Sequence, residues 1–132
     1  MSNYLVRHLG TQVGRVRGIF CLPQKIDLGL GPQDTPASWP KVPLAYVEWY
    51  SKQQPEADQQ TGMYTIKTTW NSEGVPLGAV VPLSEICQSC MLIPKYKDSR
   101  AEVDWTSQNV LDKCSSFVIN NWQHMYAYQT IW

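Results

Sequence analysis

The sequence predicts one domain, residues 1–132, of the mainly β class: a small, strongly curved β-barrel of about six strands with one short helix. A length of 132 residues is typical of a single domain. Nine prolines and eight glycines are spread through the chain, which disfavours long helices and favours short strands joined by turns. Six tryptophans and seven tyrosines stand against two phenylalanines, and aromatic rings that carry a polar atom suit a half-exposed barrel surface.

The first predicted strand covers residues 11–22, TQVGRVRGIFCL, where two sets of side chains alternate. One face would carry Gly14, Val16, Gly18 and Phe20, and the other Val13, Arg15, Arg17 and Ile19. Glycines inside a strand often mark a bend or the close approach of another backbone. A tightly curved sheet would account for both glycines.

Beyond this strand the chain alternates between turns and short strands. Residues 23–43 contain five prolines and no periodicity, so they predict a long, irregular Pro-rich loop. Alternation in residues 43–51 and 63–70 predicts a hairpin closed by a polar turn.

The carboxy-terminal half predicts three more strands and the helix. Thr106 or Ser107 would cap one or two helical turns within residues 106–114. The strands are expected at residues 79–81, 87–93 and 115–122.

Overall charge and hydropathy exclude some partners. Eleven basic residues balance eleven acidic ones, so bulk charge attracts neither duplex nucleic acid nor an anionic membrane. No apolar run reaches the roughly 18 residues that cross a bilayer, and the amino terminus, MSNYLVRHLG, lacks the apolar core of a secretory signal. We therefore expect an intracellular protein with reduced thiols and no membrane partner.

Cys87 and Cys90 form a Cys-x-x-Cys pair, which could be half of a zinc site, a redox pair or part of a buried strand. A structural zinc site commonly takes two close pairs of ligands. The remaining candidate ligands are scattered: Cys21, Cys114, His8 and His124. Residues three apart on a strand also face opposite sides. We therefore expect free cysteines, no metal and no cofactor.

No catalytic motif stands out in the sequence. A serine or cysteine nucleophile needs a histidine base and an orienting acid, but neither His8 nor His124 lies in a recognisable motif. The acidic residues lack the pairing of a glycosidase or a two-metal nuclease. Gly29 and Gly31 have no following helix, unlike a phosphate-binding loop. We expect a non-catalytic protein, with a small enzyme of unrecognised type as a third alternative.

Aromatic side chains gather in the predicted hairpin. Trp49 and Tyr50 end its first strand, Tyr64 and Trp70 bracket the second, and Glu48 lies beside them. At one barrel rim these residues could hold a methylated ammonium by cation–π contact, with the carboxylate adding charge complementarity. The alternative is that the tryptophans are core or groove-lining side chains.

Basic side chains form a second candidate set, which could contact the phosphates of a nucleic acid. Its members are Arg15, Arg17, Lys95, Lys97 and Arg100. Since acidic residues balance them elsewhere in the chain, a solvated surface explains them equally well.

Five stretches resemble, in order, the strands of a bromo-adjacent homology (BAH) domain: VGRVRGIF, LAYVEWY, MYTIKTTW, VVPLSEICQSCMLIPKY and SSFVINNW. Residues 47–50, Val-Glu-Trp-Tyr, match the family's V-x-W-F/Y strand, whereas Asn120 replaces an arginine of its last strand. A further segment of the family pattern is matched at Val81, Ile86, Cys90, Leu92 and Tyr96. The resemblance implies a BAH-like, or SH3-like, barrel that reads chromatin or docks proteins, with Trp49 as a cage wall.

The chain also resembles the carboxy-terminal region of fungal transposase-like proteins of the Plavaka, or CACTA-related, kind. The likeness covers most of residues 11–132 outside the Pro-rich loop, and VPLSEI and WTSQNVLDKC are its most specific stretches. It implies a nuclease core upstream of this region, which would itself be a non-catalytic accessory domain.

Together these observations predict a nuclear chromatin- or protein-interaction module of a transposase-like protein. The expected partner is a histone tail or another peptide, bound through the aromatic surface. The alternative is a DNA- or RNA-binding accessory domain that uses the basic set.

Overall fold

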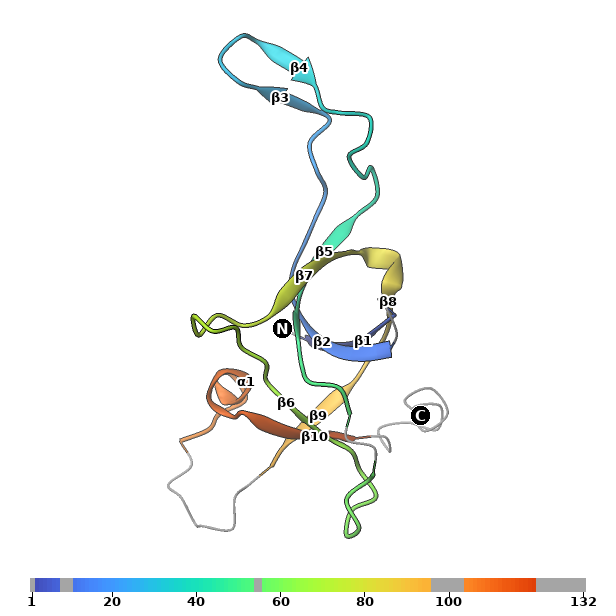
Figure 1. The fold of residues 1–132 in the computed structure, drawn as a ribbon, viewed down its shortest axis with the longest axis vertical. Coiled ribbons are helices and arrows are strands. Elements are labelled where there is room, and N and C mark those ends of the chain that lie inside the picture. The colour runs from blue at the N-terminus through green and yellow to red at the C-terminus, as the bar shows by residue number, and fades with distance from the viewer. Residues whose placement is uncertain (1, 8–10, 54–55, 96–103, 121–132) are drawn as a thin grey trace.

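The computed structural model describes residues 2–7, 11–53, 56–95 and 104–120, and the fold is mainly β (Figure 1). The described strands are β1 (Ser2–Arg7), β2 (Thr11–Phe20), β3 (Lys25–Asp27), β4 (Pro32–Asp34), β5 (Leu44–Trp49), β6 (Thr65–Lys67), β7 (Gly78–Pro82), β8 (Ile86–Ser89), β9 (Met91–Pro94) and β10 (Ser116–Asn120). They are accompanied by a 3-10 turn, η1 (Leu83–Glu85), and a short helix, α1 (Val110–Lys113). The prediction of a mainly β chain with one short helix is confirmed.

Two antiparallel sheets make up the body of the protein. The larger has five strands in the order β7-β5-β2-β1-β8, and the smaller has three in the order β6-β10-β9. Strands β3 and β4 form a separate two-stranded sheet. Among the described residues, backbone pairing closes none of these sheets into a barrel.

The two body sheets are joined at two places. Strand β8 runs directly into β9 through Cys90, whose backbone N–H donates to the carbonyl of Asn3 at 2.8 Å. On the other side Tyr50, which follows β5, forms an antiparallel bridge with Thr68, which follows β6. The larger sheet curves strongly between these junctions (Figure 1).

Buried side chains form two clusters, and β2 contributes to both. The first contains Val13, Tyr50, Ile66, Cys90, Cys114, Phe117 and Ile119. The second contains Val6, Val16, Ala45, Val47 and Val81. Because Val13 belongs to one cluster and Val16 to the other, one short stretch of β2 packs against both halves of the core.

A β-bulge at Arg17 interrupts β2. Val16 pairs with Val47 and Gly18 with Tyr46, so Arg17 is skipped in the ladder. One extra residue in a strand moves the side chain of every later residue to the opposite face of the sheet. Ile19 consequently lies opposite Ala45, on the face of Val16, and the prediction that placed it with the arginines is wrong.

The predicted strands were found, but several of their partners and limits differ. Strand β5 pairs along its length with β2 and β7, whereas β6 pairs with β10. The predicted hairpin of residues 43–51 and 63–70 is therefore wrong, apart from contacts such as the Tyr50–Thr68 bridge. The predicted strand 87–93 is divided at Cys90, and β1 was not predicted at all.

The helix begins later than the predicted capping residue. The hydroxyl of Thr106 accepts from the backbone N–H groups of Gln108 and Asn109, each at 3.3 Å. This closes a turn ahead of α1, which begins only at Val110. No helix within the described residues has the length and apolar composition to cross a bilayer.

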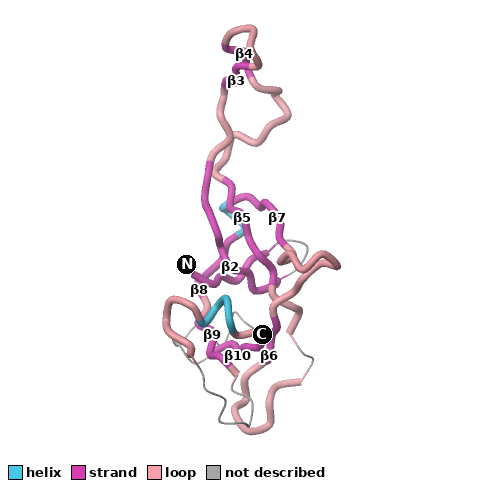
Figure 2. The backbone as a smooth tube through the Cα atoms, turned by 90° about the vertical axis from the view of Figure 1, so that its left-hand side faces the viewer, coloured by secondary structure: helices cyan, strands magenta, loops and turns pink. Residues whose placement is uncertain are grey.

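Residues 21–43, which we call the arm, project away from the body (Figures 1 and 2). The prediction of an entirely irregular loop is wrong here, because β3 and β4 pair in a short hairpin. None of the arm's residues, all of which the structure describes, is buried. The arm therefore adds no side chain to either core cluster.

Candidate functional site

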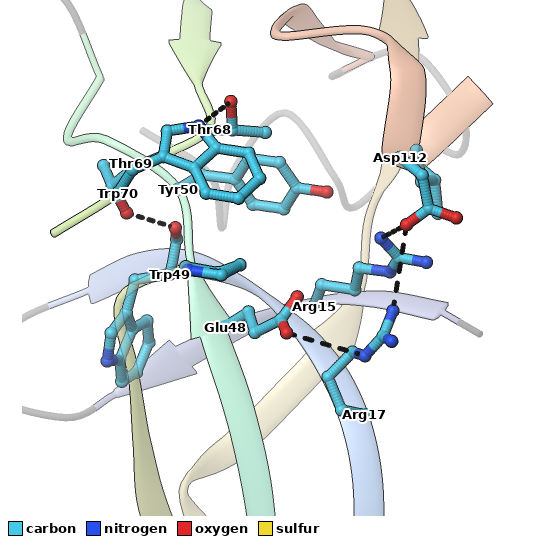
Figure 3. Close-up of a pocket in the computed structure, with 11 residues that line it drawn as sticks. Arg15, Arg17, Glu48, Trp49, Tyr50, Thr68, Thr69, Trp70 and Asp112 are labelled. Carbon is cyan, nitrogen blue, oxygen red and sulfur yellow. Dashed lines mark hydrogen bonds and ion pairs between the residues drawn. The ribbon is translucent and has the colours of Figure 1, made fainter. Parts of the chain in front are cut away.

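An open pocket of about 190 Å³ lies where β2 and the end of β5 meet α1 and the segment that follows β6 (Figure 3). It is lined by Arg15, Arg17, Glu48, Trp49, Tyr50, Thr68, Thr69, Trp70, Pro76, Leu111 and Asp112. Four of the five members of the predicted aromatic set are among them. Two members of the predicted basic set lie there as well.

Four charged side chains connect across this pocket. Nη1 of Arg15 donates to Oδ1 of Asp112 at 2.8 Å, and the Arg15 side chain is 6% exposed against 60% for Asp112. Nε of Arg17 lies 3.6 Å from Oε1 of Glu48, and its Nη1 lies 4.0 Å from Oδ1 of Asp112. The hydrogen bond from Arg15 lowers the pKa of Asp112, so this carboxyl stays ionised at neutral pH. Two cations and two anions leave the network neutral.

Tyr50 is a buried core residue that also lines the pocket. Its ring meets that of Phe117 edge to face, with centroids 5.8 Å apart and an angle of 78° between the ring planes. Its hydroxyl donates to Oδ1 of Asn3 at 3.1 Å, and burial raises its pKa to about 12. We therefore assign Tyr50 a structural role rather than that of a cage wall.

Trp49 packs against the larger sheet. A Cβ atom at Gly14 would lie 3.3 Å from Cε3 of Trp49 and would collide with Val47, so β2 needs a glycine at this position. The carbonyl of Trp49 accepts from the hydroxyl of Thr69 at 2.6 Å. In Figure 3 the indole of Trp49 points away from that of Trp70, so the two rings do not enclose a common space.

Trp70 is the exposed aromatic residue of the pocket, with 53% of its surface accessible. Its indole Nε1 donates to the hydroxyl of Thr68 at 3.2 Å, and its backbone bridges to Pro76. Thr68 is itself fixed by the bridge to Tyr50. An indole that is oriented in this way and still exposed is suited to contact a ligand.

Tyr64 lies at the other end of β6 from Trp70 and does not line the pocket. It is half-buried, and its carbonyl accepts from the backbone N–H of Ile119 at 2.9 Å. A strand that alternated throughout residues 63–70, as predicted, would carry Tyr64 and Trp70 on one face. Because β6 is only three residues long, the chain leaves that alternation before it reaches Trp70.

The predicted basic set is not gathered in one place among the described residues. Arg15 and Arg17 each contact a carboxylate in the pocket. Lys95 is exposed after β9 and does not line the pocket. Lys97 and Arg100 lie outside the described residues.

The important residue that sequence reasoning did not assign to the site is Asp112. It lies 97 positions from Arg15 in the chain, and α1 brings its carboxylate to the pocket. Leu111, on the same helix, also packs against the first core cluster and so holds α1 in place. A spacing this large leaves no signal in one sequence.

The two cysteines of the Cys-x-x-Cys pair lie in different environments. Cys87 is exposed, and its Sγ donates to the carbonyl of Glu85 at 3.5 Å. Cys90 belongs to the first core cluster, and burial raises the pKa of its thiol to about 12. Within the described residues no group of three or more histidine, cysteine, aspartate and glutamate side chains could hold a metal ion. His8 and His124 lie outside those residues.

Comparisons with models of known protein families, with curated proteins and with solved structures gave no match to this chain.

Proposed function

We propose that this chain is a non-catalytic interaction module that binds a peptide, with a histone tail as the first candidate, at the pocket beside Trp70. The observation that carries the proposal is the exposed, oriented indole of Trp70, which lines the same pocket as the carboxylates of Glu48 and Asp112. An indole face attracts a cation through its quadrupole, and a nearby carboxylate adds to that attraction. A methylated lysine side chain offers the matching chemistry.

The ion pairs favour Glu48 as the carboxylate that faces the ligand. Asp112 is held by a short hydrogen bond from the buried Arg15, at 2.8 Å. The contact between Arg17 and Glu48 is longer, 3.6 Å, and the Arg17 side chain is 34% exposed. A peptide cation could therefore displace Arg17 from Glu48 while the Arg15–Asp112 pair stays in place.

The proposal includes a barrel in which the two body sheets are the two halves. Their junctions, at Cys90 and at the Tyr50–Thr68 bridge, support it, since each lets one sheet continue into the other. The pocket lies beside the second junction, as a site at a barrel rim would. A BAH-like relationship and a place in a nuclear, transposase-like protein belong to the same proposal.

A panel of histone-tail peptides, each unmodified and trimethylated at one lysine, tests the proposed ligand. We expect a trimethylated peptide to bind more tightly than its unmodified form, measured by calorimetry. Trp70→Ala should reduce this preference by up to about fivefold, because a cation–π contact at an exposed indole is worth roughly 0.5–1 kcal/mol. Trp70→Phe should retain part of the preference.

Trp39→Ala is the matched control, because Trp39 lies in the arm and not in the pocket. It should leave peptide affinity unchanged. The proposal fails if no peptide binds, or if Trp70→Ala keeps the full preference for methylated lysine.

Nucleic-acid binding remains the competing proposal. Its support is limited to exposed basic residues such as Lys95, because Arg15 and Arg17 already contact carboxylates. Phosphate contacts predict a steep loss of affinity as salt rises, by about one unit of log–log slope for each contact. A salt titration with short DNA and RNA duplexes therefore tests the competing proposal. A steep fall of affinity with salt concentration favours nucleic-acid binding, and undetectable binding to either duplex contradicts it.

A further inference from the structure

The tip of the arm presents two leucines to solvent on an ordered turn. Leu28 is 75% exposed and Leu30 is 85% exposed. Oδ1 of Asp27 accepts from the backbone N–H groups of Gly29 at 2.8 Å and Gly31 at 3.2 Å, and both glycines have a positive φ, of 94° and 91°. The turn is thus held by hydrogen bonds within residues 27–31, and both leucine side chains stay exposed.

The base of the arm carries a second apolar region. An open pocket of about 400 Å³ is lined mainly by the apolar side chains of Tyr4, Val16, Ile19, Leu83 and Ile86. Ile19 is itself 61% exposed, and the bulge at Arg17 places it on the same face as Val16. We call this cavity the base pocket. It is a second pocket, although Arg17 lines both it and the pocket beside Trp70.

We propose that the protein forms a two-fold dimer in which the arms lie antiparallel, so that the leucines of each tip enter the base pocket of the other copy. Figures 1 and 2 show β3 and β4 at the far end of the arm, away from the body strands that carry the lining of the base pocket, so in this conformation a tip does not reach its own base pocket. Antiparallel arms bring each tip to the partner's base. A two-fold axis then makes the same contact twice, as an isologous interface requires.

Charge and stiffness both favour this arrangement. The arm carries two lysines, Lys25 and Lys41, and two aspartates, Asp27 and Asp34, so two arms do not repel each other through net charge. Its five prolines restrict the backbone, which lowers the entropy lost when the arm docks.

A second copy fits the two apolar regions better than another partner does. A membrane or an unrelated protein that bound only the tip would leave the base pocket open to water. A second copy covers both regions with one contact.

Sedimentation equilibrium over a range of protein concentrations tests the dimer. The wild-type chain should dimerise, and Leu30→Asp should weaken dimerisation about a hundredfold, since burial of one leucine is worth at least tenfold and the contact occurs twice. Val80→Asp is the matched control, because Val80 is a 51% exposed aliphatic residue on β7 that lines neither pocket. It should dimerise like the wild type.

A mixing experiment separates this geometry from general apolar association. Leu30→Asp places a charge in the tip and leaves the base pocket intact. Ile19→Asp places a charge in the base pocket and leaves the tip intact. Each variant alone should be largely monomeric. An equimolar mixture should form heterodimers through the one intact contact, at a concentration where neither variant dimerises alone.

Cysteine cross-linking tests the direction of the arms. Cys21 is exposed at the arm's base, so Leu30→Cys, in a Cys87→Ser background, should oxidise to a covalent dimer. The link should disappear when Cys21→Ser is added. A wild-type chain that stays monomeric at all concentrations, or a Leu30→Asp variant that dimerises normally, would overturn the proposal; circular dichroism of each variant verifies that it is folded.

Discussion

The body and the arm of this protein are stabilised in different ways. In the body, two clusters of buried side chains hold curved sheets together. In the arm no side chain is buried, and a short backbone ladder, the turn at Asp27 and five prolines maintain its shape. Loss of a buried side chain should therefore destabilise the body, whereas loss of a side chain from the arm should change the arm only locally.

Phe117→Ala should give the largest effect. Phe117 is fully buried, contacts the ring of Tyr50 and lies in β10, which pairs with both β6 and β9. Its truncation should lower the free energy of unfolding by about 3–5 kcal/mol, a large part of a small domain's stability. Urea denaturation measures this change.

The arm provides the control for that measurement. At a protein concentration where the chain is monomeric, Leu28→Ala removes an exposed side chain, so it should change the free energy of unfolding by less than about 0.5 kcal/mol. Equal losses in the two variants would contradict the distinction between body and arm.

Asp112→Asn should have an intermediate effect that depends on pH. The hydrogen bond from Arg15 lowers the pKa of Asp112 below its usual 3.8, so the ionised pair contributes stability above that pH. This contribution is lost as the pH falls through the lowered, folded-state pKa. We expect Asp112→Asn to cost about 1 kcal/mol at neutral pH, because Asp112 is largely exposed, and the difference from wild type to shrink toward pH 3.

Thermal unfolding of both proteins between pH 2.5 and 7 measures this difference, and Asp104→Asn is the matched control. Asp104 pairs with Lys113 at 2.9 Å, but its side chain is 89% exposed. Removal of its charge should have little effect at any pH. A difference for Asp112→Asn that stays constant down to pH 2.5 would show that ionisation of the carboxyl is not its cause.

Asp27→Ala should have the smallest effect on global stability. It removes the acceptor for two backbone N–H groups at the arm's tip, where solvent can replace it. We expect a change below about 0.5 kcal/mol in the free energy of unfolding. Hydrogen exchange should nevertheless become faster at Gly29 and Gly31, and unchanged exchange there would argue against the turn.

The sequence was most informative where neighbouring residues decide the structure. Alternation located β5, and it placed Trp49 and Tyr50 at the end of a strand. It did not identify strand partners: β6 pairs with β10, some fifty positions away, because the core around Ile66 and Phe117 determines the pairing. Nor did it detect the bulge, which depends on the match between two strands and not on β2 alone.

Prediction of the site shows the same limit. Glu48, Trp49, Tyr50 and Trp70 line one pocket, but Tyr64, which residue spacing grouped with them, does not. The ring of Trp49 and the buried Tyr50 serve packing. The charge balance of the pocket depends on Asp112, which only the three-dimensional structure brings to Arg15. Spacing identified the aromatic residues but not their electrostatic environment.

The bulge at Arg17 also has a consequence for changes in chain length. Since Val16 and Gly18 already pair with adjacent residues of β5, a deletion of residue 17 would leave the ladder on both sides in register. A deletion within an uninterrupted part of β2 would instead exchange core and solvent faces. We therefore expect residue 17 to be the position in β2 where evolution can shorten the strand without rebuilding the larger sheet.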